Sequence, residues 1–408
     1  MSPHSVSSHS GSDAESESST IVYEHEPFDT FRDRALSLAR GKLWPGIPAK
    51  DIAVERMRGG GFNRIIGLNL LTGEHTQYIL RVPRFDTTQL DRDVAALCFI
   101  QRHSRVPAPR VVTFDETEEN ELNYPYMVQN RIAGKDLYTA YPELDHCARC
   151  RIAKALGGVF RQLLAVRSSM PGRLVLPEDE KRLDAPLHVA PFPPTDPPVS
   201  IEYTGSSSVQ SVYELLTTAF KTQKAEALEL DSNDTVGSTM IDDFINMTSQ
   251  LDAAGWLAGV PYTLAHLDLA PRNILVKLAS NLEQPIISAI LDWDSALLAP
   301  MFMSCTPPLW LWAWQDDEDE DERTANHGPP TPEGYALKQL FEAAAGPSYL
   351  KYAYDPVYRL ARCLTRFAFD GVRSNEDYKE AKIMLQEWSS IHQAGFGASP
   401  VNQSAGQG

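Results

Sequence analysis

The sequence reads Tyr-Thr-Leu-Ala-His-Leu-Asp-Leu-Ala-Pro-Arg-Asn-Ile-Leu-Val from residue 262 to residue 276, and Ile-Leu-Asp-Trp-Asp from residue 290 to residue 294. The first stretch contains the pattern His-x-Asp-x-x-x-x-Asn, and in the second a carboxylate follows an apolar run. This order and spacing is typical of phosphotransferase catalytic loops, in which Asp268 would act on a substrate hydroxyl while Asn273 and Asp292 would bind Mg²⁺. Mg²⁺ prefers hard oxygen ligands, and a carboxylate beside the attacking oxygen can accept its proton.

A turn with capping side chains is the simplest alternative for this motif, because Asp and Asn often bond to backbone groups in turns. The flanking residues favour the catalytic interpretation. Residues 274–276 and 286–291 predict two short β-strands joined by a polar loop. A hairpin of this kind would bring Asn273 and Asp292 to the same end of the strand pair. We expect His266 to brace the loop backbone rather than to exchange protons.

A glycine-rich segment, Gly59-Gly60-Gly61-Phe62-Asn63, lies between two β-like runs at residues 51–57 and 65–71. Glycine lacks a Cβ, so backbone N–H groups can approach phosphates closely, and this hairpin is a candidate phosphate-binding loop. A flexible turn is the alternative for three consecutive glycines. The next predicted strand, residues 76–83, carries the single cation Arg81 where protein kinases keep the lysine that pairs with phosphates.

A helix is predicted after this strand, from about residue 88 to residue 103, because apolar residues recur there at helical spacing. Its acidic residue Asp93 lies on the turn that could face Arg81. Arginine stays charged and can bind a carboxylate or a phosphate through two hydrogen bonds, so this pair could replace the usual lysine and glutamate of kinases. The alternative is an ordinary surface ion pair, which contributes only about 0–1 kcal/mol.

Four blocks of the sequence resemble the aminoglycoside phosphotransferase family, in particular its fungal branch. They are Gly59-Gly60-Gly61-Phe62-Asn63-Arg64, Tyr78-Ile79-Leu80-Arg81-Val82-Pro83, Tyr124-Pro125-Tyr126-Met127-Val128-Gln129, and His266 to Val276 with Leu291-Asp292-Trp293-Asp294. The blocks follow the order of the family, and the last one is the most specific.

The resemblance implies an α+β protein with a two-lobed, protein-kinase-like fold, in which a small antiparallel β lobe is followed by a larger, mainly α-helical lobe. On this basis we expect an N-lobe at residues 21–128 that binds the nucleotide phosphates, a hinge at residues 129–134, and a helical C-lobe at residues 135–394 with the catalytic loop and the acceptor pocket. The Ser-rich residues 1–20 and the tail at residues 395–408 contain few apolar groups and are expected to be disordered.

The resemblance also implies transfer of the γ-phosphate of ATP to a hydroxyl of a small molecule, with Mg²⁺ as the metal. Asp268 would be the catalytic base. Arg81 would hold the phosphates with Asp93 as its partner, and Asn273 and Asp292 would be the metal ligands. The hinge backbone would bind adenine through Gln129, Asn130 and Arg131.

The sequence departs from the family at several positions. The family commonly has glycine where Leu267 stands, histidine where Ala270 stands and glutamate at Asp93, and the interval between Asn273 and Asp292 is longer than usual. None of these differences removes the base or a metal ligand. Leu267 and the longer hairpin do affect the expected geometry of the loop.

Two alternatives bear on this function. Protein Ser/Thr kinases place a lysine two residues after the catalytic aspartate, Asp-Phe-Gly at the metal ligand and Ala-Pro-Glu downstream. This chain has Ala270 and Asp292-Trp293-Asp294 and lacks Ala-Pro-Glu, which favours a small-molecule acceptor. The alternative from a different class is a pseudokinase, a nucleotide-binding or scaffold protein without turnover. Retention of the carboxylates and the amide favours the enzyme.

The composition bears on the cellular location of the protein and on the classes of partner that it can bind. A net charge of −17 over 408 residues makes nucleic acid and anionic membranes poor partners. No signal-peptide region and no membrane-spanning apolar stretch is predicted. Five cysteines, an odd number, indicate reduced thiols and a cytoplasmic location. Cys147 and Cys150 resemble half a zinc site, but helix-borne thiols are the favoured interpretation. No feature specifies an oligomeric state.

An acidic run and several tryptophans follow the predicted metal-binding strand. Residues 316–322 are all acidic, and Trp310, Trp312 and Trp314 alternate just before them, with Trp293 upstream. A solvated loop and core packing are the simple interpretations. The sharper hypothesis is a cation–π pocket for an amine-bearing alcohol, and therefore a cationic acceptor.

The remaining segments are predicted from their spacing and composition. Residues 177–200 are rich in proline and should form an extended surface excursion. Apolar residues at helical spacing predict helices at residues 212–228, 240–251, 356–369 and 378–388.

Overall fold

The computed structural model divides the chain into two compact units, and each is described by itself. Unit 1 comprises residues 1–98 and 109–132, and unit 2 comprises residues 99–108 and 133–408. The structure describes residues 27–57, 62–73, 76–84, 89–177, 182–192, 199–200, 210–230, 235–277, 285–314 and 321–393. Within these ranges no helix combines the length and the apolar character needed to cross a membrane.

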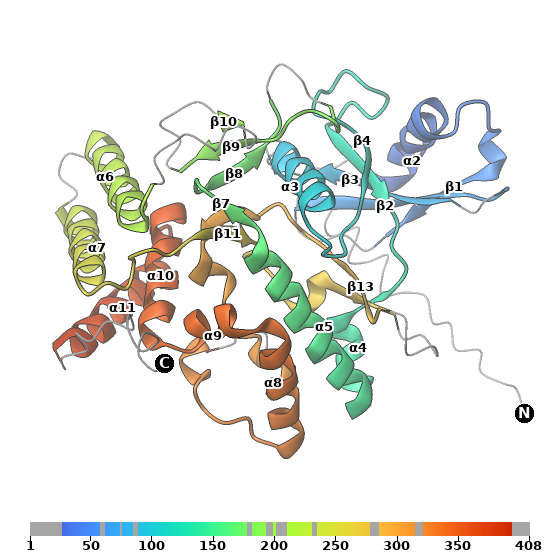
Figure 1. Cartoon of the computed structure of the whole chain (residues 1–408). Helices are drawn as coiled ribbons and strands as arrows, with labels where there is room; N and C mark the ends of the chain where they lie inside the picture. The colour runs from blue at the N-terminus through green and yellow to red at the C-terminus, as the bar shows by residue number, and fades with distance from the viewer. Residues whose placement is uncertain are drawn as a thin grey trace, which may run out of the picture. The chain divides into compact units, whose positions relative to one another are not determined.

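Unit 1 is built on a five-stranded antiparallel sheet with the strand order β1-β2-β3-β5-β4 (Figure 1). The strands are β1 (Ile52–Arg56), β2 (Asn63–Leu70), β3 (Gln77–Pro83), β4 (Val111–Asp115) and β5 (Tyr126–Asn130). Helix α2 (Phe28–Leu38) continues into a π-helical turn (Ala39–Leu43), and a 3₁₀ turn (Ala49–Asp51) precedes β1. Helix α3 (Gln89–His103) follows β3, and its residues from Phe99 onward belong to unit 2.

The core of unit 1 forms between α2 and one face of this sheet. It takes alternate residues from the strands and one stripe of the helix, including Phe31, Ala35, Leu38, Ile52, Ile66, Leu68, Leu80 and Val82. Arg81 lies between Leu80 and Val82 in β3, so its side chain leaves the opposite face, next to its register partner Ile65. Burial of the apolar face therefore determines which face presents Arg81.

Unit 2 contains two antiparallel sheets. The larger has the order β10-β9-β8-β14-β11-β7, with β7 (Arg167–Ser168), β8 (Gly172–Val175), β9 (His188–Pro191), β10 (Val199–Ser200), β11 (Tyr262–Ala265) and β14 (Leu297–Pro300). The smaller has the order β13-β12-β6, with β6 (Lys135–Asp136), β12 (Ile274–Val276) and β13 (Ile287–Ile290). The pairing of β12 with β13 confirms the predicted hairpin.

The Pro-rich segment at residues 177–200 differs in part from its prediction as a surface excursion. Its strand β9 pairs with β8, and Leu187 and Val189 are buried. These two apolar residues flank His188 in the alternation of a half-buried strand. This alternation of apolar and polar residues is short and is flanked by prolines, so the sequence alone did not indicate a strand.

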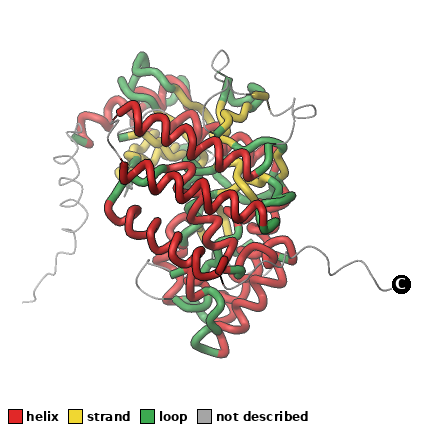
Figure 2. The backbone as a smooth tube through the Cα atoms, turned by 90° about the vertical axis from the view of Figure 1, so that its left-hand side faces the viewer, coloured by secondary structure: helices red, strands yellow, loops and turns green. Residues whose placement is uncertain are grey.

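The helices of unit 2 are α4 (Leu137–Ala140), α5 (His146–Ala165), α6 (Val212–Leu230), α7 (Thr235–Ala253), α8 (Pro332–Ala345), α9 (Pro347–Ala353), α10 (Pro356–Asp370) and α11 (Asn375–Gln393). Side-chain caps explain several of their starts, because Asp145, Thr331 and Asp355 accept backbone N–H bonds at the beginnings of α5, α8 and α10. Helices α6, α7, α10 and α11 pack side by side, and Figure 2 shows this group from its outer side.

Helix α5 packs closely against α8. A Cβ atom placed on Gly157 would lie 2.4 Å from the carbonyl oxygen of Phe341, so only glycine permits this approach. Beside this contact, the rings of Phe160, Phe341 and Tyr349 meet edge to face, with centroid distances of 5.2–5.4 Å. The pairing of α5 with α8 forms a rigid wall of unit 2.

The predicted fold class is confirmed, since an antiparallel β unit and a larger, mainly helical unit are both present. The four predicted helices correspond to α6, α7, α10 and α11. The units meet along the chain at three places, Cys98/Phe99, Ala108/Pro109 and Ile132/Ala133, and the hinge at residues 129–134 stays a prediction.

Cys147 and Cys150 lie in the first turns of α5, as predicted for helix-borne thiols. The Sγ atom of Cys150 is 3.4 Å from Nε2 of His146. In the described part of the chain no group of three or more His, Cys, Asp or Glu side chains could hold a metal ion. None of the five cysteines, all within that part, forms a disulfide.

Candidate active site

The predicted catalytic loop lies in unit 2 and begins where the buried strand β11 ends. A 3₁₀ turn (Pro271–Asn273) closes the loop, with the Asn273 N–H donating to the carbonyl of Ala270 at 3.0 Å, and β12 follows at once. The loop is therefore held between two strands of different sheets. Strands on either side fix the positions of the polar residues between them.

The carboxylate of Asp268 is oriented by two residues of its own loop. Nη2 of Arg272 lies 2.7 Å from Oδ1, and Nδ2 of Asn273 lies 2.9 Å from Oδ2. The same Asn273 amide nitrogen also donates to the Asp268 carbonyl at 2.9 Å. These donors fix the direction of the carboxylate. About a third of the Asp268 side chain stays exposed, so its remaining lone pairs are accessible to a ligand.

His266 links the catalytic loop to the predicted metal-binding strand. Its ring is buried. Nε2 of the ring is 2.9 Å from the carbonyl oxygen of Leu291, and Nδ1 is 3.2 Å from the backbone nitrogen of Asp268. A carbonyl only accepts and a backbone N–H only donates, so Nε2 carries the proton and Nδ1 accepts. Burial lowers the pKa of His266, against smaller opposing effects of the Leu291 carbonyl and nearby carboxylates. The neutral ring thus braces the loop, as its sequence position predicted.

The β12–β13 hairpin brings Asp292 next to Asn273. Ile274 pairs with Ile290, and one residue further out the Leu291 N–H donates to the Asn273 carbonyl at 2.8 Å. Asp292 follows with a φ of +64°, a left-handed conformation that is uncommon for a residue other than glycine. Non-glycine residues in this region are concentrated at functional sites. The expectation that Asn273 and Asp292 share one end of the hairpin is confirmed.

The donor set at this end of the hairpin fits Mg²⁺. Both Asn273 side-chain hydrogen bonds use Nδ2, so Oδ1 is the atom suited to act as a ligand, and Asp292 supplies a carboxylate. Mg²⁺ is usually bound by one or two carboxylates together with substrate phosphates and water, not by an all-protein cage. A set of two side chains agrees with that pattern.

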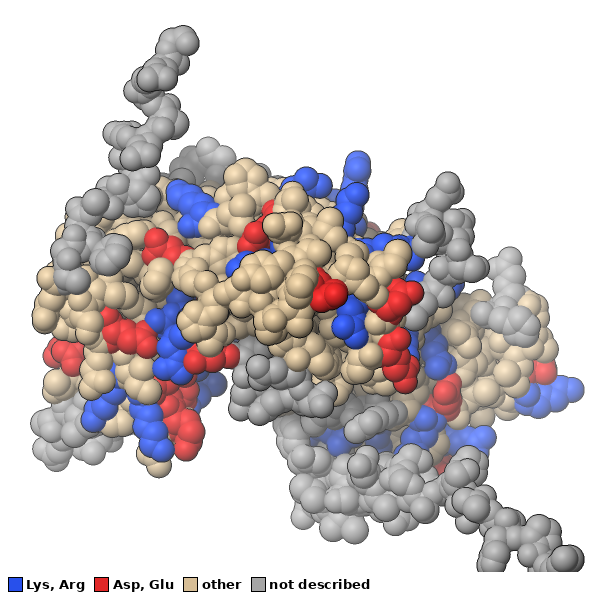
Figure 3. Space-filling model, turned by 90° about the horizontal axis from the view of Figure 1, so that it is seen from below, with Lys and Arg blue, Asp and Glu red and all other residues tan. Residues whose placement is uncertain are grey.

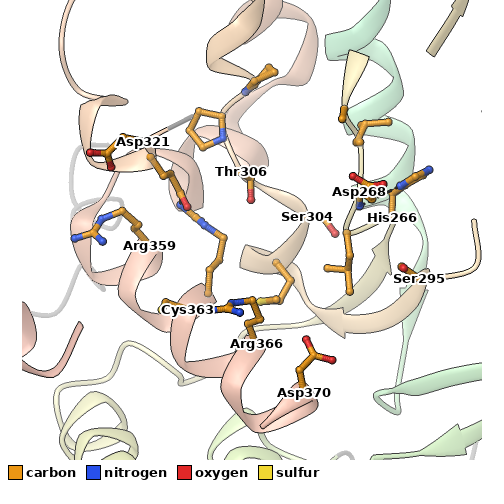
Figure 4. A pocket seen from close by; sticks show the side chains of 18 of the residues that line it. His266, Asp268, Ser295, Ser304, Thr306, Asp321, Arg359, Cys363, Arg366 and Asp370 are labelled. Carbon is orange, nitrogen blue, oxygen red and sulfur yellow. Dashed lines mark hydrogen bonds and ion pairs between the residues drawn. The ribbon is translucent and has the colours of Figure 1, made fainter. Parts of the chain in front are cut away.

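A cavity of about 1160 Å³ opens beside Asp268 within unit 2. In Figure 4, His266, Asp268 and Ser295 lie on one side of this cavity, and Arg359, Cys363 and Arg366 of α10 lie on the other. Its volume slightly exceeds the range of about 300–1,000 Å³ that is usual for small-molecule sites. Burial, followed by the nearby Glu380, raises the pKa of Cys363 to about 12, which disfavours the nucleophilic thiolate form.

Comparison with known proteins identifies the family. Residues 69–337, about two thirds of the chain, match the model of the phosphotransferase enzyme family known as APH. The chain belongs to this family. The match includes Arg81, Asp93 and the whole catalytic loop with Asp292.

Several solved structures are also similar to this phosphotransferase family member. A mutant of aminoglycoside 2'-phosphotransferase-IIIa in complex with GDP is 14% identical, with 89% of this chain and 98% of that chain covered and a TM-score of 0.46. A thermostable mutant of APH(4)-Ia with AMP-PNP and hygromycin B is 16% identical, with 89% and 99% covered and a TM-score of 0.46. The ternary complex of streptomycin, ATP and APH(2")-IIa is 11% identical, with 86% and 94% covered and a TM-score of 0.47. No curated protein matches the sequence significantly. The family assignment rests on the sequence match alone.

Unit 1 of this family member contains the predicted ion pair. Nη1 of Arg81 lies 2.9 Å from Oδ2 of Asp93, and both side chains are less than a tenth exposed. The pair joins β3 to α3. The alternative interpretation, an ordinary ion pair on the surface, is therefore wrong for Arg81 and Asp93.

The other predicted nucleotide-binding residues of unit 1 are only partly described. Gly59, Gly60 and Gly61 lie outside the described residues, while Phe62 is two-thirds exposed and Asn63 begins β2. In the segment predicted to bind adenine, Gln129 and Asn130 belong to β5. The Asn130 and Arg131 N–H groups donate to the carbonyls of Arg110 and Gln77, so these two donors are engaged within the sheet. Adenine binding by this segment stays a prediction.

The tryptophans divide between the cavity and the core. Trp310 and Trp314 contribute to the cavity lining, whereas Trp293 is fully buried and donates its indole N–H to the Ile290 carbonyl. One face of the buried Trp312 is already covered by Lys338, whose Nζ lies 5.6 Å from the ring centroid. Core packing thus accounts for Trp293 and Trp312.

The described end of the acidic run is neutralised by arginines. Asp321 and Glu322 form ion pairs with Arg323 and Arg362. The cavity lining as a whole carries seven Arg and Lys side chains and seven Asp and Glu side chains, so its charge is balanced. Acidic and basic side chains are also interspersed over the face shown in Figure 3.

The sequence interpretation missed the residues that line the far wall of the cavity. Arg359, Arg362 and Arg366 lie along one face of α10 and pair with Glu387, Glu322 and Glu380. The signal was present as three arginines spaced by three and four residues within a predicted helix. Arg272, which binds Asp268, was missed as well, although it stands four residues after that carboxylate.

Proposed function

We propose that this chain transfers the γ-phosphate of ATP to a hydroxyl group of a small molecule. The observation that carries the proposal is the linkage of Asp268, Asn273 and Leu291 through the buried His266 ring and the β12–β13 hairpin, at the edge of a cavity large enough for an acceptor. A partly exposed carboxylate thereby lies close to Asn273 and to the end of β13, where Asp292, the second proposed oxygen ligand, follows. Phosphotransferases need this combination.

Asp268 would act as the catalytic base. The acceptor hydroxyl would give its proton to the carboxylate while its oxygen forms a bond to the γ-phosphorus, and the bond from that phosphorus to the β-phosphate oxygen would break to release ADP. Arg272 and Asn273 would hold the carboxylate in one orientation during this step. Mg²⁺, when bound by Asn273 and Asp292, would neutralise phosphate charge.

Unit 1 would contribute the grip on the phosphates. Arg81 is the proposed cation for the phosphates that are not transferred, and Asp93 would hold its guanidinium in place. The glycines at residues 59–61 are the proposed phosphate-binding loop. A cytoplasmic location and a positively charged acceptor both stay predictions.

Incubation of the protein with ATP, Mg²⁺ and a panel of alcohols and amino alcohols, with ADP release and phosphorus-31 NMR of the products as readouts, tests the proposal. A phosphorylated product from at least one alcohol supports it. Nucleotide binding without any product across a broad panel would instead support the pseudokinase. A panel in which neutral alcohols react and amino alcohols do not would contradict the positively charged acceptor.

The metal-binding part of the proposal has a test that does not need the acceptor. Asp292→Ala removes a ligand from the proposed Mg²⁺ site, so the increase in melting temperature caused by AMP-PNP with Mg²⁺ should fall. The matched control is Asp243→Asn, which alters an exposed carboxylate on α7 outside the cavity. An undiminished shift in Asp292→Ala would contradict the assignment.

A further inference from the structure

Leu267, the residue immediately before Asp268, has an unusual backbone conformation. Its φ is +65°, in the left-handed region where a side chain with a Cβ is disfavoured. Among the described residues only Asn123 and Asp292 share this property without being glycine. Asparagine tolerates the region well, and Asp292 is a proposed metal ligand. Leucine has no polar atoms that could compensate for this conformation.

Burial does not compensate for it either. The Leu267 side chain is 42% exposed, and the residue forms part of the cavity lining. Leucine at this position thus combines an unfavourable backbone with an apolar surface open to the cavity. Glycine would avoid both costs, so the side chain contributes little to the stability of the free protein.

Other apolar surfaces line the same cavity. Tyr138 is also well exposed, and its ring lies 5.7 Å from that of Trp314. Trp314 in turn stacks on Tyr141 at 4.8 Å, which fixes its orientation. The apolar part of the lining therefore includes aromatic side chains as well as leucine.

Four arginines of the lining form ion pairs within the protein. Arg272 binds Asp268, and the arginines of α10 are each paired with a carboxylate. A ligand that contacts these arginines would have to compete with the carboxylates that already bind them. Covering the exposed apolar groups, in contrast, only removes them from water, which is favourable.

We propose that Leu267 is a specificity-determining residue, which contacts an apolar part of the acceptor next to the hydroxyl that reacts at Asp268. The acceptor class is then an alcohol that carries an aromatic or aliphatic group close to its hydroxyl. This inference rests on the proposed phosphotransferase function. Binding energy gained at Leu267 would offset the cost of its backbone conformation.

Two substitutions at Leu267 distinguish the effect of its side chain from the effect of its backbone conformation. Leu267→Ala removes the side chain but keeps a Cβ at positive φ, whereas Leu267→Gly removes both. Leu340→Ala is the matched control, because Leu340 is 37% exposed on α8 and lies outside the cavity lining. Melting temperatures of all variants establish that they fold, and Leu267→Gly should melt at or above the temperature of Leu267→Ala.

Discrimination between 2-phenylethanol and ethanol provides the activity readout. For each protein the ratio of the two kcat/KM values is measured with ATP and Mg²⁺, so a general loss of activity cancels. Wild type should prefer 2-phenylethanol, and the ratio should fall by at least about fourfold in Leu267→Ala and Leu267→Gly, the effect of one methylene group removed from water. Leu340→Ala should keep the wild-type ratio. Unchanged ratios in both Leu267 variants would overturn the inference, and so would a change confined to glycine.

Binding of 2-phenylethanol, measured by calorimetry with AMP-PNP present, separates this inference from the proposed function. Weaker binding in both Leu267 variants supports contact at Leu267 even if no protein in the set forms a product, in which case only the phosphotransferase proposal fails. Equal binding in wild type and both variants overturns the inference, whether or not ATP is consumed.

Discussion

Two arginine–aspartate pairs with similar geometry differ in burial. Arg81 and Asp93 of unit 1 are 2.9 Å apart with side chains 9% and 5% exposed, and Arg272 and Asp268 of unit 2 are 2.7 Å apart with side chains 48% and 37% exposed. The first pair joins a strand to a helix, and the second lies within one loop. Distance alone does not distinguish them.

The difference in solvent exposure predicts different roles for the two pairs, one in the stability of the fold and one in the reaction. Removing one partner of a buried pair leaves an uncompensated charge away from water, whereas an exposed pair contributes little because water screens both charges. The exposed Asp268 can instead meet a substrate. We therefore expect the buried pair to dominate stability and the exposed pair to dominate turnover.

Asp268→Asn should have the largest effect. An amide cannot accept the hydroxyl proton as a carboxylate does, so the rate of phosphoryl transfer should fall by about 10²–10⁴-fold. The melting temperature and the affinity for AMP-PNP should change little, because the side chain is partly exposed. Single-turnover kinetics and calorimetry measure these quantities, with Asp243→Asn as the control. Wild-type turnover by Asp268→Asn would contradict the assignment of the base.

Arg81→Met tests the buried pair. The substitution leaves Asp93 charged and buried, so the free energy of unfolding should fall by about 3–5 kcal/mol. The double variant Arg81→Met with Asp93→Leu should recover part of this loss, since no unpaired charge remains. Urea denaturation measures both.

The same unit offers a matched control for that experiment. Arg131 and Glu55 are 2.6 Å apart with side chains 27% and 46% exposed, and Arg131→Met should cost only about 0–1 kcal/mol. Equal losses in Arg81→Met and Arg131→Met would show that burial does not separate the pairs.

Arg272→Gln tests the exposed pair without removing the base. The variant loses a charge-assisted hydrogen bond that orients Asp268, and we expect kcat to fall by about tenfold, since hydrogen bonds to charged groups contribute about 1.5–3 kcal/mol. Stability should change by less than about 1 kcal/mol. Arg272→Lys should be intermediate. A loss of stability as large as that of Arg81→Met would contradict the distinction between the pairs.

His266 provides a smaller, pH-dependent test of the same principle, because it is buried without an ion-pair partner in its hydrogen bonds. Burial lowers its pKa below the ordinary value of 6.5, so the unfolded chain binds the proton more readily than the folded chain. The stability contributed by the neutral ring is complete above pH 6.5 and is lost as the pH falls through the lowered pKa. In metal-free buffer, the difference in unfolding free energy between wild type and His266→Gln should shrink between pH 7.5 and pH 5.5. The exposed His327→Gln is the control, and a constant difference for His266→Gln would contradict the neutral buried ring.

Local sequence patterns predicted much of this protein. Two short apolar runs predicted the hairpin that brings Asp292 beside Asn273, and the structure places His266, Asp268 and Asn273 together in one loop. The catalytic role of that loop stays a prediction. Residues close in sequence, or joined by a short turn, have few alternative arrangements, so their spacing is informative. The pairing of Arg81 in β3 with Asp93 in α3 was predictable for the same reason, because these two elements follow each other directly in the sequence.

Only the tertiary structure decided features that depend on distant segments. The burial of Arg81 and Asp93 depends on packing between β3 and α3, the pairing of α10 arginines depends on α11 and residue 322, and the pairing of β9 with β8 overrides a proline-rich composition. The left-handed conformation of Leu267, in the loop between β11 and β12, is likewise a feature that only the tertiary structure reveals. Sequence spacing specifies which groups are near each other along the chain. Burial and backbone conformation are set by the rest of the fold, because they depend on which surfaces exclude water and which paths remain for the backbone.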